Sequence, residues 1–188
     1  MTSTVRLTVM VFPGTQTLPL FAAQTIGLFE KRGLSVELKP APNSEEQRRG
    51  LAEGRYEIVH GAADQAVAMV EDMKADALIV AGGDNGFNHL FVQPEIATLA
   101  DLRGRTVVVD VANTGWSFVA YNILTRAGLN RGDYAVKEAG APFRRFEAMR
   151  DDRSIAAGIL NPPFAIRARQ AGLKDMGPVT QTIGPYLG

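Results

Sequence analysis

The 188-residue sequence contains no cysteine. This absence excludes disulfide bonds, thiolate metal sites and cysteine nucleophiles, and it fits either the cytosol or the periplasm. The only two histidines, His60 and His89, show no metal-ligand spacing, so we expect no metal site. Walker loops, Gly-x-Gly-x-x-Gly fingerprints and a Ser–His–Asp spacing are also missing, so we expect neither a cofactor nor a catalytic residue.

Neither a charge excess nor a long apolar run is present. Twenty Lys and Arg residues balance 20 Asp and Glu residues, so the net charge gives no indication of binding to nucleic acid or to an anionic membrane. No segment approaches the roughly 18 apolar residues of a membrane span. The opening MTSTVRLTV lacks the basic and apolar regions of a signal peptide. The chain is therefore either cytoplasmic, or periplasmic with its export signal removed.

The first half of the chain alternates strand-like and helix-like segments. Apolar, β-branched or alternating runs predict strands at VRLTVMV (5–11), LSVEL (34–38), EIVHG (57–61) and ALIVAGG (77–83). Helical periodicity predicts helices over 18–33, 44–53 and 62–73. Ser44 is expected to cap the second helix, with Gln47 three residues on. Residues 1–86 therefore form a first predicted lobe.

The same order returns after an extended stretch at 87–96, which we interpret as a crossover between two lobes. Residues 97–178 form the second lobe, and 179–188 begin a second crossover or a tail. Strands are predicted over 105–111, 134–140 and 154–160, with helices over 118–128, 141–152 and 164–172. The residues NTGWS (113–117) are predicted to form a turn.

Alternating strands and helices predict an α/β fold built of βαβ units with parallel sheets and right-handed crossovers. Two such lobes, each Rossmann-like and three-layered, would enclose a cleft. In open α/β sheets, ligands bind outside the carboxyl ends of the strands. The segments at those ends are FPGTQT, HGAAD, DNG, DVANTGW and LNPP.

Four stretches, in this order, resemble the substrate-binding proteins of nitrate, sulfonate and thiamine-pyrimidine type ABC transporters. They are FAAQTIGLFEKRGLSVELKPA, EGRYEIVHGAADQAVA, DLRGRTVVVDVANTGWSFVAYNILTRAGL and IAAGILNPPFAIRARQAGL. The resemblance covers nearly the whole chain. It implies a periplasmic-binding-protein type II fold that closes on a small molecule and delivers it to an ABC permease. It also implies helices that return to the first lobe after TIGPYLG, and these we expect to be missing.

Five polar residues of lobe one are candidate ligand contacts. Thr15 and Gln16 occupy the first strand-to-helix turn, where a helix cap is the alternative. His60 and Asp64 flank the end of the third strand, where a buried histidine and a first-turn carboxylate are equally good structural explanations. Asp84 lies near the crossover, and turn formation also explains it.

Lobe two offers three further candidates. Trp116, the only tryptophan, can stack on a flat ligand or pack in the core. Thr114 is favoured as a ligand contact because the turn has more polar residues than one helix cap needs. Asn161 precedes two prolines at a strand end. Arg144 and Arg145 are expected to be solvated helix residues, with bidentate binding of a carboxylate or phosphate as the alternative.

The leading hypothesis is a solute-binding protein that captures a small polar molecule, planar if it stacks on Trp116, for ABC-type import. Its partners would be that ligand and a permease, without nucleic acid and without a membrane span of its own. One alternative is an enzyme similar to thiamine-pyrimidine synthases, although the cysteine-rich segment of those enzymes is lacking. The other is a ligand-sensing effector domain like those of LysR-type regulators.

Overall fold

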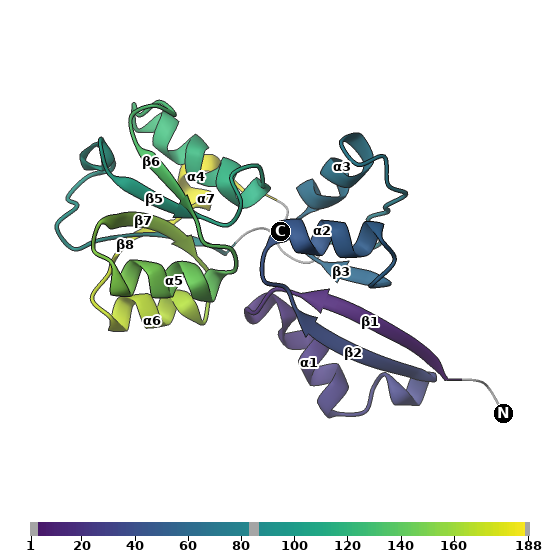
Figure 1. Cartoon of the computed structure of the whole chain (residues 1–188). Helices are drawn as coiled ribbons and strands as arrows, with labels where there is room; N and C mark the ends of the chain where they lie inside the picture. The colour runs from purple at the N-terminus through teal and green to yellow at the C-terminus, as the bar shows by residue number, and fades with distance from the viewer. Residues whose placement is uncertain (1–3, 83–86, 187–188) are drawn as a thin grey trace.

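The computed structural model describes residues 4–82 and 87–186, which form two α/β lobes (Figure 1). Lobe one contains, in order, β1 (Val5–Val11), the 3-10 turn η1 (Thr15–Thr17), α1 (Leu18–Thr25), η2 (Glu30–Arg32), β2 (Leu34–Pro40), α2 (Ser44–Ala52), β3 (Ile58–His60) and α3 (Ala63–Glu71). Lobe two contains β4 (His89–Val92), η3 (Leu99–Leu102), β5 (Thr106–Val109), α4 (Gly115–Arg126), β6 (Ala135–Glu138), α5 (Pro142–Asp151), β7 (Ile155–Leu160), α6 (Phe164–Gln170), β8 (Lys174–Pro178) and α7 (Thr180–Ile183).

The sheet of lobe one has the order β2-β1-β3, and its strands are parallel. Helix α1 lies on one face, while α2 and α3 lie on the other (Figure 1). Val11 at the end of β1 is in register with both Pro40 and His60, so the carboxyl ends of all three strands meet at one edge. That edge faces lobe two, as the βαβ pattern of the sequence predicts.

The sheet of lobe two has the order β6-β5-β7-β4-β8, and it is mixed rather than parallel throughout. Strand β4 runs antiparallel to both β7 and β8. Residues 87–96, predicted as a crossover, therefore include a strand inside the second sheet. The reason is burial on both faces: Leu90, Phe91 and Val92 are at most 5% exposed, and such a continuous apolar run is typical of a central strand.

The predicted strand at 77–83 is not formed in its described part. Residues 77–82 have no regular secondary structure, and Leu78, Ile79 and Val80 are 83%, 60% and 85% exposed. Apolar β-branched composition favours a strand only where a neighbouring strand accepts its backbone hydrogen bonds. The sheet of lobe one ends at β3, so these residues lack that neighbour among the described segments.

Three helix predictions are also corrected. Helix α4 begins at Gly115, so Trp116 belongs to its first turn and not to a preceding loop. Helix α2 is capped by Asn43, whose Oδ1 accepts a hydrogen bond from the Glu46 amide at 2.7 Å, and not by Ser44. The helix predicted over 18–33 ends at Thr25, and none of the residues of α1 is buried.

The hydrophobic core is distributed unequally between the lobes. In lobe two, one apolar cluster includes Val107 and Leu124 and another includes Phe91 and Met149, so buried residues from both sheet and helices contribute to its core. The small cluster of lobe one joins Met10 and its neighbours to Ala141 of lobe two. Packing between the lobes thus contributes to the folding of lobe one. Among the described residues, no helix is long and apolar enough to cross a membrane.

We predict that Gly158→Ala destabilises lobe two. A Cβ at this position in β7 would lie 2.6 Å from Val108 Cγ1 and 2.9 Å from Met149 Sδ, both in the core. Overpacking of this kind costs about 1–3 kcal/mol, which urea unfolding would show as a lower midpoint. Gly132→Ala is the matched control because its Cβ would meet no atom within 4 Å. Equal midpoints for the two variants would contradict the prediction.

Candidate functional site

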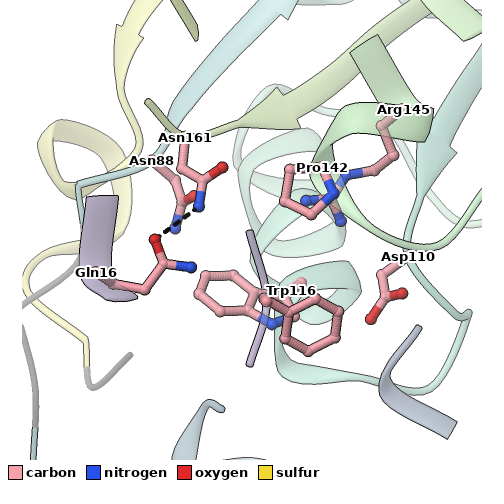
Figure 2. Close-up of a pocket in the computed structure, with 8 residues that line it drawn as sticks. Gln16, Asn88, Asp110, Trp116, Pro142, Arg145 and Asn161 are labelled. Carbon is pink, nitrogen blue, oxygen red and sulfur yellow. Dashed lines mark hydrogen bonds between the residues drawn. The ribbon is translucent and has the colours of Figure 1, made fainter. Parts of the chain in front are cut away.

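A small cavity lies where the strand ends of the two lobes meet (Figure 2). Its volume is about 20 Å³, roughly the space of one ordered water molecule. Its lining comes from both lobes and consists of Phe12, Gln16, Asn88, Asp110, Trp116, Pro142, Arg145 and Asn161. In this view, Gln16 and Asn161 lie on one side of the Trp116 ring and Asp110 lies on the other. The lobes are therefore closed on each other in this structure.

On one side of the cavity, the first turn of lobe one contacts the proline turn of lobe two. The Thr15 amide donates a hydrogen bond to the Pro162 carbonyl at 3.1 Å. Asn161 Nδ2 donates to Gln16 Oε1 at 3.2 Å, the bond drawn in Figure 2. These contacts join the segments after β1 and β7, which are the central strand of one sheet and an inner strand of the other.

A second set of contacts joins the start of α2 to lobe two. The Ala141 amide donates to the Pro42 carbonyl at 3.0 Å. Gly140 has a φ of 75° and no room for a side chain, since a Cβ there would lie 2.6 Å from the Pro42 oxygen. The Ser44 hydroxyl donates to Asp110 Oδ2. Ser44 was predicted as a helix cap, and it instead binds a carboxylate of the opposite lobe.

The third contact caps a helix of one lobe with a carboxylate of the other. Asp64 Oδ2 accepts a hydrogen bond from the Gly115 amide, the first residue of α4, at 2.6 Å. Thr114 occupies the N-cap position, but its hydroxyl bonds to the Val111 carbonyl at 3.1 Å and does not cap the helix. Asp64 therefore supplies the acceptor that a capping side chain usually provides. Burial raises the pKa of Asp64, although the Gly115 amide and the charge of Arg48 oppose that shift.

Three buried polar atoms at the cavity make no hydrogen bond within the described structure. They are Asp110 Oδ1, Arg145 Nε and Asn161 Oδ1, in side chains that are 2–4% exposed. Burial lowers the pKa of Arg145, and the nearby charge of Asp110 partly offsets that effect. A buried polar group without a partner is costly, and native structures contain few of them. One donor and two acceptors thus remain available at the cavity for a bound molecule.

Trp116 lines a second cavity as well as this one. Its ring contacts Tyr186 edge-on, with centroids 6.4 Å apart and planes at 85°. The second cavity, of about 160 Å³, is lined by Ala62, Asp64, Gly115, Trp116, Val119 and Tyr186. The indole therefore has an accessible surface towards both cavities and is not fully enclosed in the core of lobe two.

The structure brings five of the eight predicted residues to the contact between the lobes. Gln16, Trp116 and Asn161 line the small cavity, while Thr15 and Asp64 make hydrogen bonds across the lobes beside it. His60 ends β3, where its carbonyl accepts a hydrogen bond from Gln47. Thr114 is fully buried under the start of α4 and is not among the cavity residues. Asp84 lies outside the described residues. Ligand contact stays a prediction for all eight.

Sequence reasoning missed Asp110 and misjudged Arg145. Asp110 ends the buried run VVVD directly after β5, and a carboxylate at a strand end was a usable signal. Arg145 was expected to be solvated, like Arg144, but it is 4% exposed. Its burial follows from its place on the face of α5 that also buries Pro142, Phe146 and Met149, a face that helical periodicity indicates. For Phe12, Asn88 and Pro142, which also line the cavity, no sequence pattern indicated such a position.

A family model described as "ABC transporter, phosphonate, periplasmic substrate-binding protein" matches residues 24–167. A search of curated protein sequences finds no match.

Several solved structures share the fold. The alkanesulfonate-binding protein SsuA from Xanthomonas axonopodis pv. citri, bound to MOPS, is 16% identical with a TM-score of 0.80, over 98% of this chain and 64% of that one. The periplasmic aliphatic sulphonate-binding protein SsuA from Escherichia coli is 17% identical with a TM-score of 0.72, over 99% and 65%. The periplasmic nitrate-binding protein NrtA from Synechocystis PCC 6803 is 14% identical with a TM-score of 0.79, over 96% and 52%.

The chain thus spans less than two thirds of the length of these three structures, from 52% to 65%. The expected two-lobed fold of the periplasmic-binding-protein type is confirmed.

We predict that Gly115→Ala loosens the closed arrangement without weakening α4. The added Cβ would lie 2.5 Å from Asp64 Oδ1, so the carboxylate must move away from the Gly115 amide. Alanine favours a helix over glycine by about 1 kcal/mol, which offsets the loss of about 1 kcal/mol from the displaced Asp64 cap, so the stability of α4 itself should not change. Small-angle scattering should show a larger radius of gyration than for the natural chain or Gly132→Ala. An unchanged radius would refute the role of this contact in closure.

The raised pKa of Asp64 also predicts a pH dependence. The folded protein holds the Asp64 proton more tightly than the unfolded chain does, so its contribution to stability falls as pH rises above the ordinary value of 3.8 towards the raised one. Asp64→Asn removes this titration and keeps an oxygen acceptor for Gly115. The free energy of unfolding of Asp64→Asn, relative to the natural chain, should therefore be higher at pH 7 than at pH 4. Asp72→Asn, at the exposed end of the same helix, is the control. A pH-independent difference for Asp64→Asn would contradict the prediction.

Proposed function

Because the chain belongs to the family of periplasmic substrate-binding proteins of phosphonate-type ABC transporters, we propose that it binds a small polar solute between its two lobes for import. The observation that carries this proposal is the set of partnerless atoms at the cavity: Asp110 Oδ1, Arg145 Nε and Asn161 Oδ1. A ligand that hydrogen-bonds to these atoms offsets the cost of their burial. The site would then be complete only when it is occupied.

Binding requires the lobes to separate first. A cavity of about 20 Å³ holds no organic molecule, so the solute enters an open form and the lobes close over it. The contacts made by Asp64, Thr15 and Ser44 are few and polar, and each joins one lobe to the other. Such contacts can exchange with water at moderate cost, which suits a reversible closure.

The side chains at the cavity indicate which ligand groups would be recognised. The Arg145 guanidinium suits an oxyanion, because its planar N–H groups match the geometry of such a group. The Asp110 and Asn161 oxygens accept from ligand N–H or O–H groups. Trp116 and Phe12 offer ring faces for a planar ligand. Two of the similar structures are of an aliphatic sulphonate-binding protein and a nitrate-binding protein.

Import by an ABC transporter also requires a permease, and we propose one as the second partner, with the periplasm as the location. Both proposals rest on the family. The enzyme and the effector domain are the alternatives from other classes. Membership of a family of substrate-binding proteins favours capture and release of an unchanged solute over turnover.

The proposal predicts that Arg145→Met weakens ligand binding by about ten-fold or more, since a hydrogen bond to a charged group contributes about 1.5–3 kcal/mol. The fluorescence of Trp116, the only tryptophan, would report binding of nitrate, an alkanesulfonate, an alkylphosphonate and an aminopyrimidine. The free energy of unfolding is measured beside the affinity, because the variant leaves the buried Asp110 carboxylate without its nearby positive charge.

Arg144→Met is the matched control, because Arg144 is exposed on the same helix. Equal affinities for Arg145→Met and the natural chain would remove Arg145 from the site. The wider proposal fails if none of the four probes binds and native mass spectrometry finds no small molecule in the purified protein.

A further inference from the structure

Helix α4 begins without a hydrogen bond from its own N-cap side chain. Thr114 holds that position, but its hydroxyl bonds to the Val111 carbonyl at 3.1 Å. The Gly115 amide donates instead to Asp64 Oδ2 of lobe one at 2.6 Å. A cap supplied by the other lobe is in place only while the lobes are closed. In the open form that admits a solute, the first turn of α4 therefore presents its amides to any acceptor in the cleft.

The carboxylate of Asp64 is also held from its own lobe. Gln65 Nε2 donates to Asp64 Oδ2 at 2.7 Å, and Gln65 Oε1 accepts from Arg48 Nη1 at 3.2 Å. Burial disfavours the ionised carboxylate, whereas the Gly115 amide and the positive charge of Arg48 favour it. A helix amide and a guanidinium thus act on the same point. Both stabilise negative charge there, whichever group carries the charge.

The space around this contact admits a group from outside the chain. The cavity of about 160 Å³ is bounded by Asp64, Gly115 and Trp116, and a cavity of about 150 Å³ is known to hold benzene. Gly115 keeps the approach to its amide open, since a Cβ there would lie 2.5 Å from Asp64 Oδ1. A small oxyanion therefore has room beside the Gly115 amide once the carboxylate moves away.

We propose that the Asp64 carboxylate fills an oxyanion-binding position in the cleft, and that an oxyanion from outside the chain takes this position only after Asp64 withdraws. The inference rests on the proposed function, because it requires lobes that open to a solute. Asp64 is then an internal competitor of anionic solutes. It raises the solute concentration that binding requires, and it does so without touching the solute.

Competition and simple closure predict opposite effects of removing this carboxylate. If Asp64 only joins the lobes, its loss weakens the closed form and lowers the affinity for every solute. If Asp64 competes, its loss raises the affinity for anionic solutes and does not raise the affinity for uncharged ones.

The first test refills the position with acetate, which is the aspartate side chain without its backbone. In Asp64→Ala, acetate should bind at millimolar concentration and return the NMR signal of the Gly115 amide towards its position in the natural chain. The natural chain should need at least ten-fold more acetate, because its own carboxylate is tethered at a high effective concentration. Acetamide, which has a similar shape without the charge, should bind Asp64→Ala at least ten-fold more weakly than acetate.

Two further variants make this test specific. Asp72→Ala removes a carboxylate at the exposed end of the same helix, so its response to acetate should equal that of the natural chain. Asp64→Asn keeps the size of the side chain and removes its charge, and it decides the question if Asp64→Ala does not fold. Equal acetate affinities for the natural chain and the folded Asp64 variants would overturn the proposal. An equal gain in Asp72→Ala would also overturn it.

The second test uses the solutes themselves, followed by the fluorescence of Trp116. Asp64→Ala should bind nitrate, an alkanesulfonate or an alkylphosphonate about ten-fold more tightly than the natural chain does. Its affinity for an uncharged aminopyrimidine should not rise. A lower affinity for the anionic probes would assign Asp64 to closure alone and overturn the proposal. If acetate binds Asp64→Ala as expected but no probe binds either form, the filled oxyanion position stands and the proposed function alone is contradicted.

Discussion

Parallel strands place all their carboxyl ends at one edge of a sheet, and this constraint determines where the two lobes meet. The polar turns that follow β1, β5 and β7 need hydrogen-bond partners there, and each of them finds at least one partner in the opposite lobe. The closed arrangement is thus stabilised by hydrogen bonds to these polar turns as well as by apolar packing. Three atoms, on Asp110, Arg145 and Asn161, are left over, and they mark the place where a ligand fits.

The parts of this architecture that could be predicted from the sequence are local in origin. The bounds of β1, Val5–Val11, were predicted without error, because its β-branched run favours a strand and the Pro-Gly turn marks its end. Gln16, Trp116 and Asn161 were placed at the contact between the lobes because each lies in the segment that runs from the end of a strand through the first turn of the next helix. Arg145 was not found, because arginine is usually solvated, even though this one shares a helix face with the buried Phe146 and Met149.

The errors concerning the sheets share one physical cause. Whether an apolar run becomes a strand depends on a neighbour that can be far away in sequence. Residues 89–92 became a central strand because β7 and β8 lie on either side of them. Residues 77–82, which are equally apolar, remained irregular beside a groove. Composition indicates that a segment can form a strand, whereas the presence of a neighbouring strand determines whether it does.

Helix α4 has its N-terminal acceptor, Asp64, in the other lobe. Separation of the lobes and fraying of the first turn of α4 are therefore a single event. The loss of a helix cap costs about 1 kcal/mol, so this coupling biases the empty protein towards closure before any ligand arrives. The same coupling links hydrogen exchange of the Gly115 amide to lobe opening. The rate of this exchange therefore reports how often the two lobes separate.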